Sequence, residues 1–255
     1  MGWLGSEPGK MVGVLRDPSF NGSLDPDEWR RWAREWRGAG RFEEALRAHE
    51  WYHAHVLELR ESAYGVRLSF ALMEWMRLAD VYPPARESLT RVRTEAATAA
   101  LGSSRDREAF HDAVSIDRIL GDEVAAYDLI ERVEAEHGDR LDDYFNGEVF
   151  RVLSARREYE RCVRWMGDPV REVDLAAERL DFERSPTIPE LIRERSAGRF
   201  IDRVIELAVV LLGAGDTTGA QQIVRQASRH LDHPRLTGAL EEARRILDER
   251  PPVSG

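Results

Sequence analysis

The residues whose spacing most clearly suggests chemistry lie between positions 49 and 53. His49 and His53 flank Glu50 in the pattern H-E-x-x-H, on a stretch whose apolar periodicity predicts a helix. Residues four apart on a helix share one face, so both imidazoles would project together. Two such histidines can bind zinc, and the glutamate can act as a general base on a metal-bound water. The pattern therefore indicates a zinc-dependent hydrolase as one alternative.

The surroundings of this pattern favour a packing role for its histidines. Zinc hydrolases with this motif usually carry an uncharged residue where Arg47 stands and an apolar one where His55 stands. A third ligand would come from elsewhere in the chain, without a motif to mark it, and the candidates are His55, Glu74 and His111. His49 and His53 also lie on the apolar stripe of their own helix. We therefore expect no catalytic residue and no cofactor, with metal binding by these two histidines as the alternative.

A second group of residues could act through charge. On the first predicted helix, charged side chains follow one side, about 100° from the tryptophan stripe. When the later helices are aligned by their apolar stripes in the same way, further basic side chains fall on this side. The predicted binding residues are Asp27, Arg30, Arg34, Arg37, Arg67, Arg77, His111, Arg118 and Arg151. Because guanidinium groups match carboxylates and phosphates, this face predicts an acidic or phosphorylated partner. The alternative is a solvated helix face with local charge pairs such as Asp27 with Arg31.

Composition limits the classes of function. The 255 residues are 42% hydrophobic and 33% charged, which is typical of a helix-rich globular chain. A formal net charge of −10 disfavours general attraction to nucleic acid or to a membrane surface. Cys162 is the single cysteine, so an intramolecular disulfide is impossible and a cytoplasmic location is expected. Lys10 is the single lysine, so nearly all positive charge comes from arginine. A GC-rich bacterial genome would produce the same preference for arginine without any functional cause. No apolar run reaches the roughly 18 residues of a membrane span.

Helices must position these groups. Asp25 followed by Pro26 is typical of a helix start, and Gly38 to Gly40 ends the tryptophan stripe shortly before a second helix begins near Phe42. So short a connection predicts an antiparallel hairpin. Similar hairpins follow, with turns near residues 80–84, 120–122, 156–157 and 213–216, and a last helix is expected from about 234 to 247. Strand-like alternation is essentially absent, so the predicted fold class is all-α.

The hairpins recur at a regular distance. Small residues stand early in each return helix, at Ala45, Ala85, Ala126, Cys162 and Ala220. The first three separations, of 40, 41 and 36 residues, are typical of helical-hairpin repeats, and the fourth, of 58, leaves room for an extra helix. We expect a flexible leader at 1–24, one helical-repeat domain of about five to six hairpins at 25–250, and a tail at 251–255. Residues 168–199 would form an irregular insert or the extra helix.

The first and last hairpins resemble tetratricopeptide repeats. The first matches the pattern at Trp29, Trp32, Ala33, Trp36, Gly40, Phe42, Ala45 and His49. The last matches it at Val204, Leu207, Ala208, Leu211, Gly215, Thr217, Ala220, Val224 and Ala227. The resemblance covers roughly residues 26–247 and is weaker between the two ends. It implies an α-solenoid with a right-handed superhelix whose concave face binds peptides or protein segments.

These observations together predict a non-enzymatic interaction scaffold. One hairpin cannot bury its apolar stripe alone, so neighbours stack and leave an extended inner surface suited to peptide binding. The expected partner is an acidic or phosphorylated protein segment, and neither a membrane nor a nucleic acid is expected. A zinc hydrolase and an RNA-binding helical repeat are the alternatives, and the oligomeric state is left open.

Overall fold

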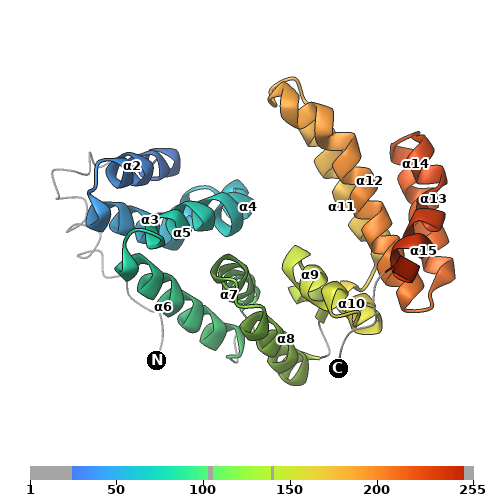
Figure 1. Cartoon of the computed structure of the whole chain (residues 1–255), viewed down its shortest axis with the longest axis horizontal. Helices are drawn as coiled ribbons and strands as arrows, with labels where there is room; N and C mark the ends of the chain where they lie inside the picture. The colour runs from blue at the N-terminus through green and yellow to red at the C-terminus, as the bar shows by residue number, and fades with distance from the viewer. Residues whose placement is uncertain (1–24, 103–105, 139–140, 250–255) are drawn as a thin grey trace. The chain divides into compact units, whose positions relative to one another are not determined.

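The computed structural model describes residues 25–102, 106–138 and 141–249, and these residues form helices joined by turns (Figure 1). The structure is 85% helical and contains no strand within these ranges, which confirms the all-α prediction. The expected leader at 1–24 and tail at 251–255 lie outside the described residues. Within the described ranges, none of the helices combines the length and the apolar character that crossing a membrane requires.

The chain divides into two compact units. Unit 1 comprises the residues up to Glu95 together with Ile119–Gly121, and unit 2 comprises Ala96–Arg118 and the residues from Asp122 onward. Unit 1 contains α2 (Pro26–Gly38), α3 (Phe42–Leu59), η1 (Glu61–Ala63), α4 (Tyr64–Val66), η2 (Arg67–Ala71), α5 (Leu72–Ala79) and most of α6 (Pro83–Ala100). Unit 2 contains α7 (Arg107–Leu120) apart from its last two residues, α8 (Glu123–His137), η3 (Leu141–Tyr144), α9 (Gly147–Ala155), α10 (Tyr159–Met166), α11 (Pro169–Glu183), α12 (Glu190–Gly213), α13 (Thr217–His230), α14 (Pro234–Thr237) and α15 (Ala239–Glu249).

Four hairpins close with the same turn. In each, a backbone N–H donates to the carbonyl oxygen five residues earlier, and these bonds join Arg41 to Trp36 (2.8 Å), Asp122 to Asp117 (2.9 Å), Glu158 to Leu153 (3.0 Å) and Asp216 to Leu211 (2.8 Å). The residue before each donor has a positive φ, and these residues are Gly40, Gly121, Arg157 and Gly215. Glycine adopts this conformation without steric cost, so three of the four turn residues suit their backbone.

The turn between α5 and α6 is built differently. The N–H of Tyr82 donates to the carbonyl of Leu78, four residues earlier, at 2.8 Å. Pro83 then begins α6, where the missing N–H of a proline costs nothing because the first turn leaves that group without a partner. This hairpin therefore departs from the geometry that the other four turns share.

Tryptophans form the centre of unit 1. The side chain of Asp25 accepts the N–H of Asp27 at 3.0 Å and caps α2, so the predicted helix start is confirmed. The tryptophan stripe of α2 faces α3, where the rings of Trp29 and Trp51 stack with centroids 4.0 Å apart. Trp29 and Trp75 are both fully buried, so these rings supply much of the apolar area that holds the hairpins together.

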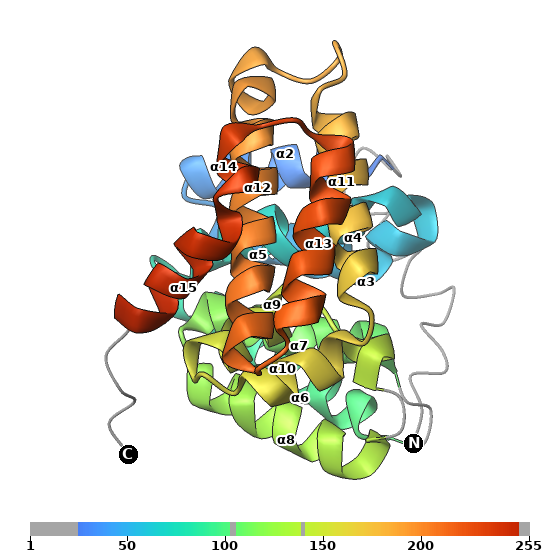
Figure 2. The ribbon, with the colours of Figure 1, turned by 90° about the vertical axis from the view of Figure 1, so that its right-hand side faces the viewer.

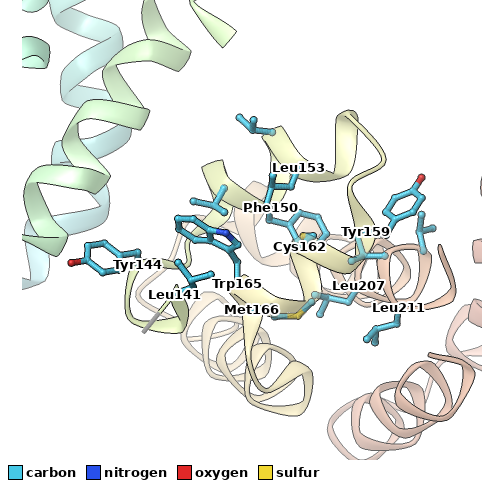
Figure 3. Packing of buried hydrophobic residues seen from close by; sticks show 14 of the residues in the cluster. Leu141, Tyr144, Phe150, Leu153, Tyr159, Cys162, Trp165, Met166, Leu207 and Leu211 are labelled. Atoms are coloured by element: carbon cyan, nitrogen blue, oxygen red, sulfur yellow. The ribbon is translucent and has the colours of Figure 1, made fainter. Parts of the chain in front are cut away.

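In unit 2, α12 is the central helix and packs against α10, α11, α13 and α15 (Figure 2). Its side chains Leu207 and Leu211 lie near Phe150 of α9 and Cys162 of α10 (Figure 3). Cys162 is fully buried, and this burial raises the pKa of its thiol to about 12. The thiol is therefore protonated at neutral pH and acts as a small packing group.

Two segments of unit 2 can be compared with the sequence-based expectations in detail. For residues 168–199 the sequence allows an irregular insert or an extra helix, and the structure has helix α11 followed by the first ten residues of α12. The single helix expected at 234–247 is wrong, because Gly238 separates α14 from α15. Glycine lowers the helical preference at that point, and the chain turns there instead of continuing.

Candidate binding site

His49 of the H-E-x-x-H pattern is a core residue. Its ring lies parallel to that of Trp75, with centroids 5.9 Å apart and planes 10° from parallel. Burial lowers the pKa of His49 to about 3, and the positive charges of Arg37, Arg30 and Arg34 lower it further. The imidazole is therefore neutral at neutral pH and packs against the indole.

The other members of the pattern have separate contacts. Glu50 points toward α6, where its carboxylate accepts hydrogen bonds from Ser88 Oγ (2.5 Å) and Arg91 Nη2 (3.0 Å). The guanidinium of Arg67 lies 3.3 Å from His53 Nε2 and donates to the carbonyl oxygen of His53 at 2.8 Å. A fixed cation beside Nε2 opposes a metal ion at that nitrogen through like-charge repulsion. Among the described residues, no three His, Cys, Asp or Glu side chains are placed to hold a metal together.

The predicted arginines of α2 surround a single carboxylate from α5. Glu74 Oε1 accepts hydrogen bonds from Arg30 Nη2 at 3.2 Å and from Arg34 Nη1 at 3.0 Å. The Glu74 side chain is only 13% exposed, so this largely buried carboxylate holds both guanidinium groups in position. Arg37 and Arg77 have no carboxylate within ion-pair distance in the described part of the chain. Arg37 lies three residues after Arg34 on α2, and Arg77 lies three residues after Glu74 on α5. Each therefore lies on the same side of its helix as the residue that it follows.

The remaining predicted residues of unit 1, Asp27 and Arg67, contact other residues of the same unit. Asp27 pairs with Arg60 at 2.7 Å, which ties the start of α2 to the residue after α3. Arg67 is buried against His53. The structure therefore leaves a compact cationic surface of Arg30, Arg34, Arg37 and Arg77, which we call the α2–α5 face.

The predicted residues of unit 2 lie in a separate cluster. His111 is buried, its Nε2 lies 3.0 Å from the carbonyl oxygen of Tyr144, and burial lowers its pKa. Glu148 pairs with both Arg118 (2.5 Å) and Arg151 (3.1 Å), and Arg151 also reaches Glu123 at 2.7 Å. Here the carboxylates match the guanidinium groups in number, so the positive charge is largely neutralised.

Prediction from the sequence missed the carboxylates that sit between pairs of arginines. Glu74 and Glu148 act in this way, and so do Glu134, between Arg161 and Arg164, and Glu183, between Arg179 and Arg199. Glu74 of α5 holds two arginines of α2, Glu148 of α9 holds one arginine of α7 and one of α9, and Glu183 joins α11 to α12. A register drawn on one helix cannot show such contacts.

A groove in unit 2 is a second surface feature. Two cavities of about 510 and 540 Å³ share the lining residues Arg179, Arg203 and Glu206, so they adjoin along α11 and α12. Arg203 pairs with Glu172 at 3.0 Å and lies 4.1 Å above the ring of Phe150. Because the charges on the groove floor are paired, the groove does not select an acidic ligand in the way that the α2–α5 face does.

No protein-family model matches the sequence, and comparisons with curated proteins and with solved structures yield no match.

Proposed function

We propose that this chain is a non-enzymatic helical-repeat scaffold of tetratricopeptide type, and that its α2–α5 face binds an acidic or phosphorylated protein segment. The shared turn of four hairpins supports the repeat interpretation, because the same hydrogen bond and the same backbone conformation recur at each. Sequence positions that match the tetratricopeptide pattern lie in the first and the last of these hairpins.

The charge of the α2–α5 face is the observation that carries the functional proposal. Of the four guanidinium groups on this face, only those of Arg30 and Arg34 pair with a carboxylate of the described residues, that of Glu74, in a chain whose formal net charge is −10. A local positive surface on an acidic protein attracts acidic segments while the rest of the surface repels them. Glu74 holds Arg30 and Arg34 in place, so less side-chain freedom is lost when a carboxylate or phosphate binds them.

The arginines without carboxylate partners provide the cleanest test. Arg37→Glu combined with Arg77→Glu reverses charge on the face and leaves the contacts of Glu74 intact. A fluorescent peptide rich in aspartate and glutamate, and its counterpart with asparagine and glutamine, serve as probes. We expect the protein to bind the acidic peptide, more weakly at high salt, and the double variant to bind it at least about tenfold less tightly.

The matched control is Arg225→Glu combined with Arg244→Glu, two exposed arginines of α13 and α15. This variant carries the same net charge as the first, so it separates local from overall electrostatics. Equal affinity for the acidic and amide peptides would contradict the proposal. So would an equal loss of binding in the two double variants.

A further inference from the structure

The α11–α12 hairpin of unit 2 concentrates exposed apolar side chains. Leu175 is 47% exposed and Phe182 is 67% exposed on α11, and Leu191 and Ile192 are exposed at the start of α12. Half of the large hydrophobic residues that are exposed in the described part of the chain therefore lie within this hairpin. An apolar patch of this kind beside charged residues is typical of a protein interface.

These side chains border the groove described above. Leu175, Arg179 and Phe182 follow one another at spacings of four and three residues, so they form one stripe along α11. Leu175 and Arg179 line the groove, and Phe182 continues its edge toward the tip of the hairpin. On the opposite side of the hairpin, α13 packs against both α11 and α12 (Figure 2). Among the described residues, α13 thus covers one side of the helix pair, and the groove lies between the two helices with Leu175 and Arg179 in its lining.

The two walls of the groove carry opposite exposed charges. On α11, Arg179 is 73% exposed and uses its Nε to contact Glu183 at 2.9 Å, which leaves its terminal nitrogens at the surface. On α12, Glu206 is 59% exposed, and its contact with Arg203 is long, at 3.6 Å. A helix that fits this groove needs an apolar stripe and a basic residue on the side that faces α12. The stripe of α11 itself, Leu175 with Arg179 and Phe182, meets this description.

We propose that a second copy of this chain occupies the groove, with its α11 lying between α11 and α12 of the first. A twofold arrangement makes each contact twice, so Arg179 of each copy faces Glu206 of the other. The four helices form a bundle in which Leu175 and Phe182 of both copies are buried. The acidic and basic side chains that line the groove are equal in number. Two copies can therefore approach through this surface with less electrostatic repulsion than the net charge of −10 causes between other parts of their surfaces.

Sedimentation velocity of this chain over about a hundredfold range of concentration tests the proposal. We expect a monomer–dimer equilibrium. Leu175→Glu combined with Phe182→Glu should abolish the dimer, because four carboxylates would then enter the apolar centre. Arg179→Glu alone, or Glu206→Arg alone, should raise the dissociation constant at least about tenfold through like-charge contacts. Arg179→Glu combined with Glu206→Arg should restore the dimer, since the charges again oppose one another.

Val124→Glu is the matched control, because Val124 is 63% exposed on α8 and is not among the residues that line the groove. Circular dichroism shows whether each variant keeps its helices. A monomer at every concentration overturns the proposal. So does a dimer that withstands the Leu175 and Phe182 changes, or a charge-swapped variant that stays as weak as its single parents. This interface does not use the α2–α5 face, so the two proposals fail independently.

Discussion

At the scale of single residues, Gly213 shows how closely the hairpins are packed. It ends α12, and a Cβ built there would lie 2.2 Å from Cδ2 of Tyr159, a buried ring at the start of α10. Gly213→Ala must therefore displace an aromatic ring within the core of unit 2. We expect the free energy of unfolding in urea to fall by about 1–3 kcal/mol.

Gly38 is the control for this substitution. It occupies the equivalent position of the first hairpin, three residues before the donor of the shared turn, and its Cβ would meet no atom within 4 Å. Gly38→Ala should be neutral or should stabilise by up to about 1 kcal/mol, because alanine favours the helix. Equal destabilisation by the two substitutions would show that backbone conformation, and not Tyr159, requires the glycine.

His49 gives unit 1 a dependence on pH. Its pKa is about 3 in the folded state and 6.5 in the absence of the fold, so the unfolded chain binds a proton that the folded chain excludes. This residue therefore costs no stability above pH 6.5 and destabilises the fold progressively as the pH falls from 6.5 toward 3. In His49→Leu that dependence is absent. Between pH 7 and pH 5 we expect the free energy of unfolding of the native protein to fall by about 2 kcal/mol more than that of the variant.

Comparing the two proteins removes the contributions of groups that they share, including His111 and the carboxylates. Denaturant unfolding at several pH values measures the difference. A constant gap between His49→Leu and the native protein over this range would mean that His49 takes up a proton in the folded state. That result would contradict its placement against Trp75 and beside three arginines.

At the scale of elements, the shared turn identifies one position where the sequence does not suit the backbone. Arg157 has φ of 60°, where the equivalent residues of the other three turns are glycines. A side chain in this left-handed conformation costs about 1 kcal/mol. Arg157→Gly should therefore stabilise the protein by up to about 1 kcal/mol, measured as a higher midpoint of thermal unfolding.

The reciprocal substitutions should have the opposite effect. Gly121→Ala and Gly215→Ala place a Cβ in open space, so any cost arises from the positive φ alone. We expect each to destabilise by about 1 kcal/mol. A lower unfolding midpoint for Arg157→Gly, or unchanged midpoints for both alanine variants, would argue against a common constraint at these turns.

The elements also show what the sequence could predict. The hairpin turns and the buried stripe of α2 follow from local signals, such as the cap at Asp25 and the glycines with positive φ, and they were predicted. Long-range pairing has no local signal. Glu74 lies 40 residues from Arg34, so the predicted cationic surface was drawn without the carboxylate that organises it. Arg67 lies in the π-helical turn η2, where its side chain is buried, and a regular α-helical register does not predict that position.

At the scale of the whole molecule, the proposed functions belong to different units. The α2–α5 face lies in unit 1, and the α11–α12 groove lies in unit 2. A scaffold that binds a partner with one unit and a second copy with the other would present two identical acidic-segment sites per dimer. Such a dimer binds a partner with repeated acidic segments more tightly than a monomer can, because the second contact is intramolecular.

The division into two units predicts that stability is distributed between them. Each unit is compact in its own contacts, so local unfolding in one need not expose the other. Gly213→Ala should speed amide hydrogen exchange in α10, α12 and α13 while leaving α2, α3 and α5 unchanged. Leu72→Ala, which empties a fully buried site in α5, should do the reverse. Mass spectrometry of the exchanged peptides distinguishes these patterns. If either substitution accelerated exchange equally in both units, the chain would unfold as one cooperative body, which would contradict this prediction.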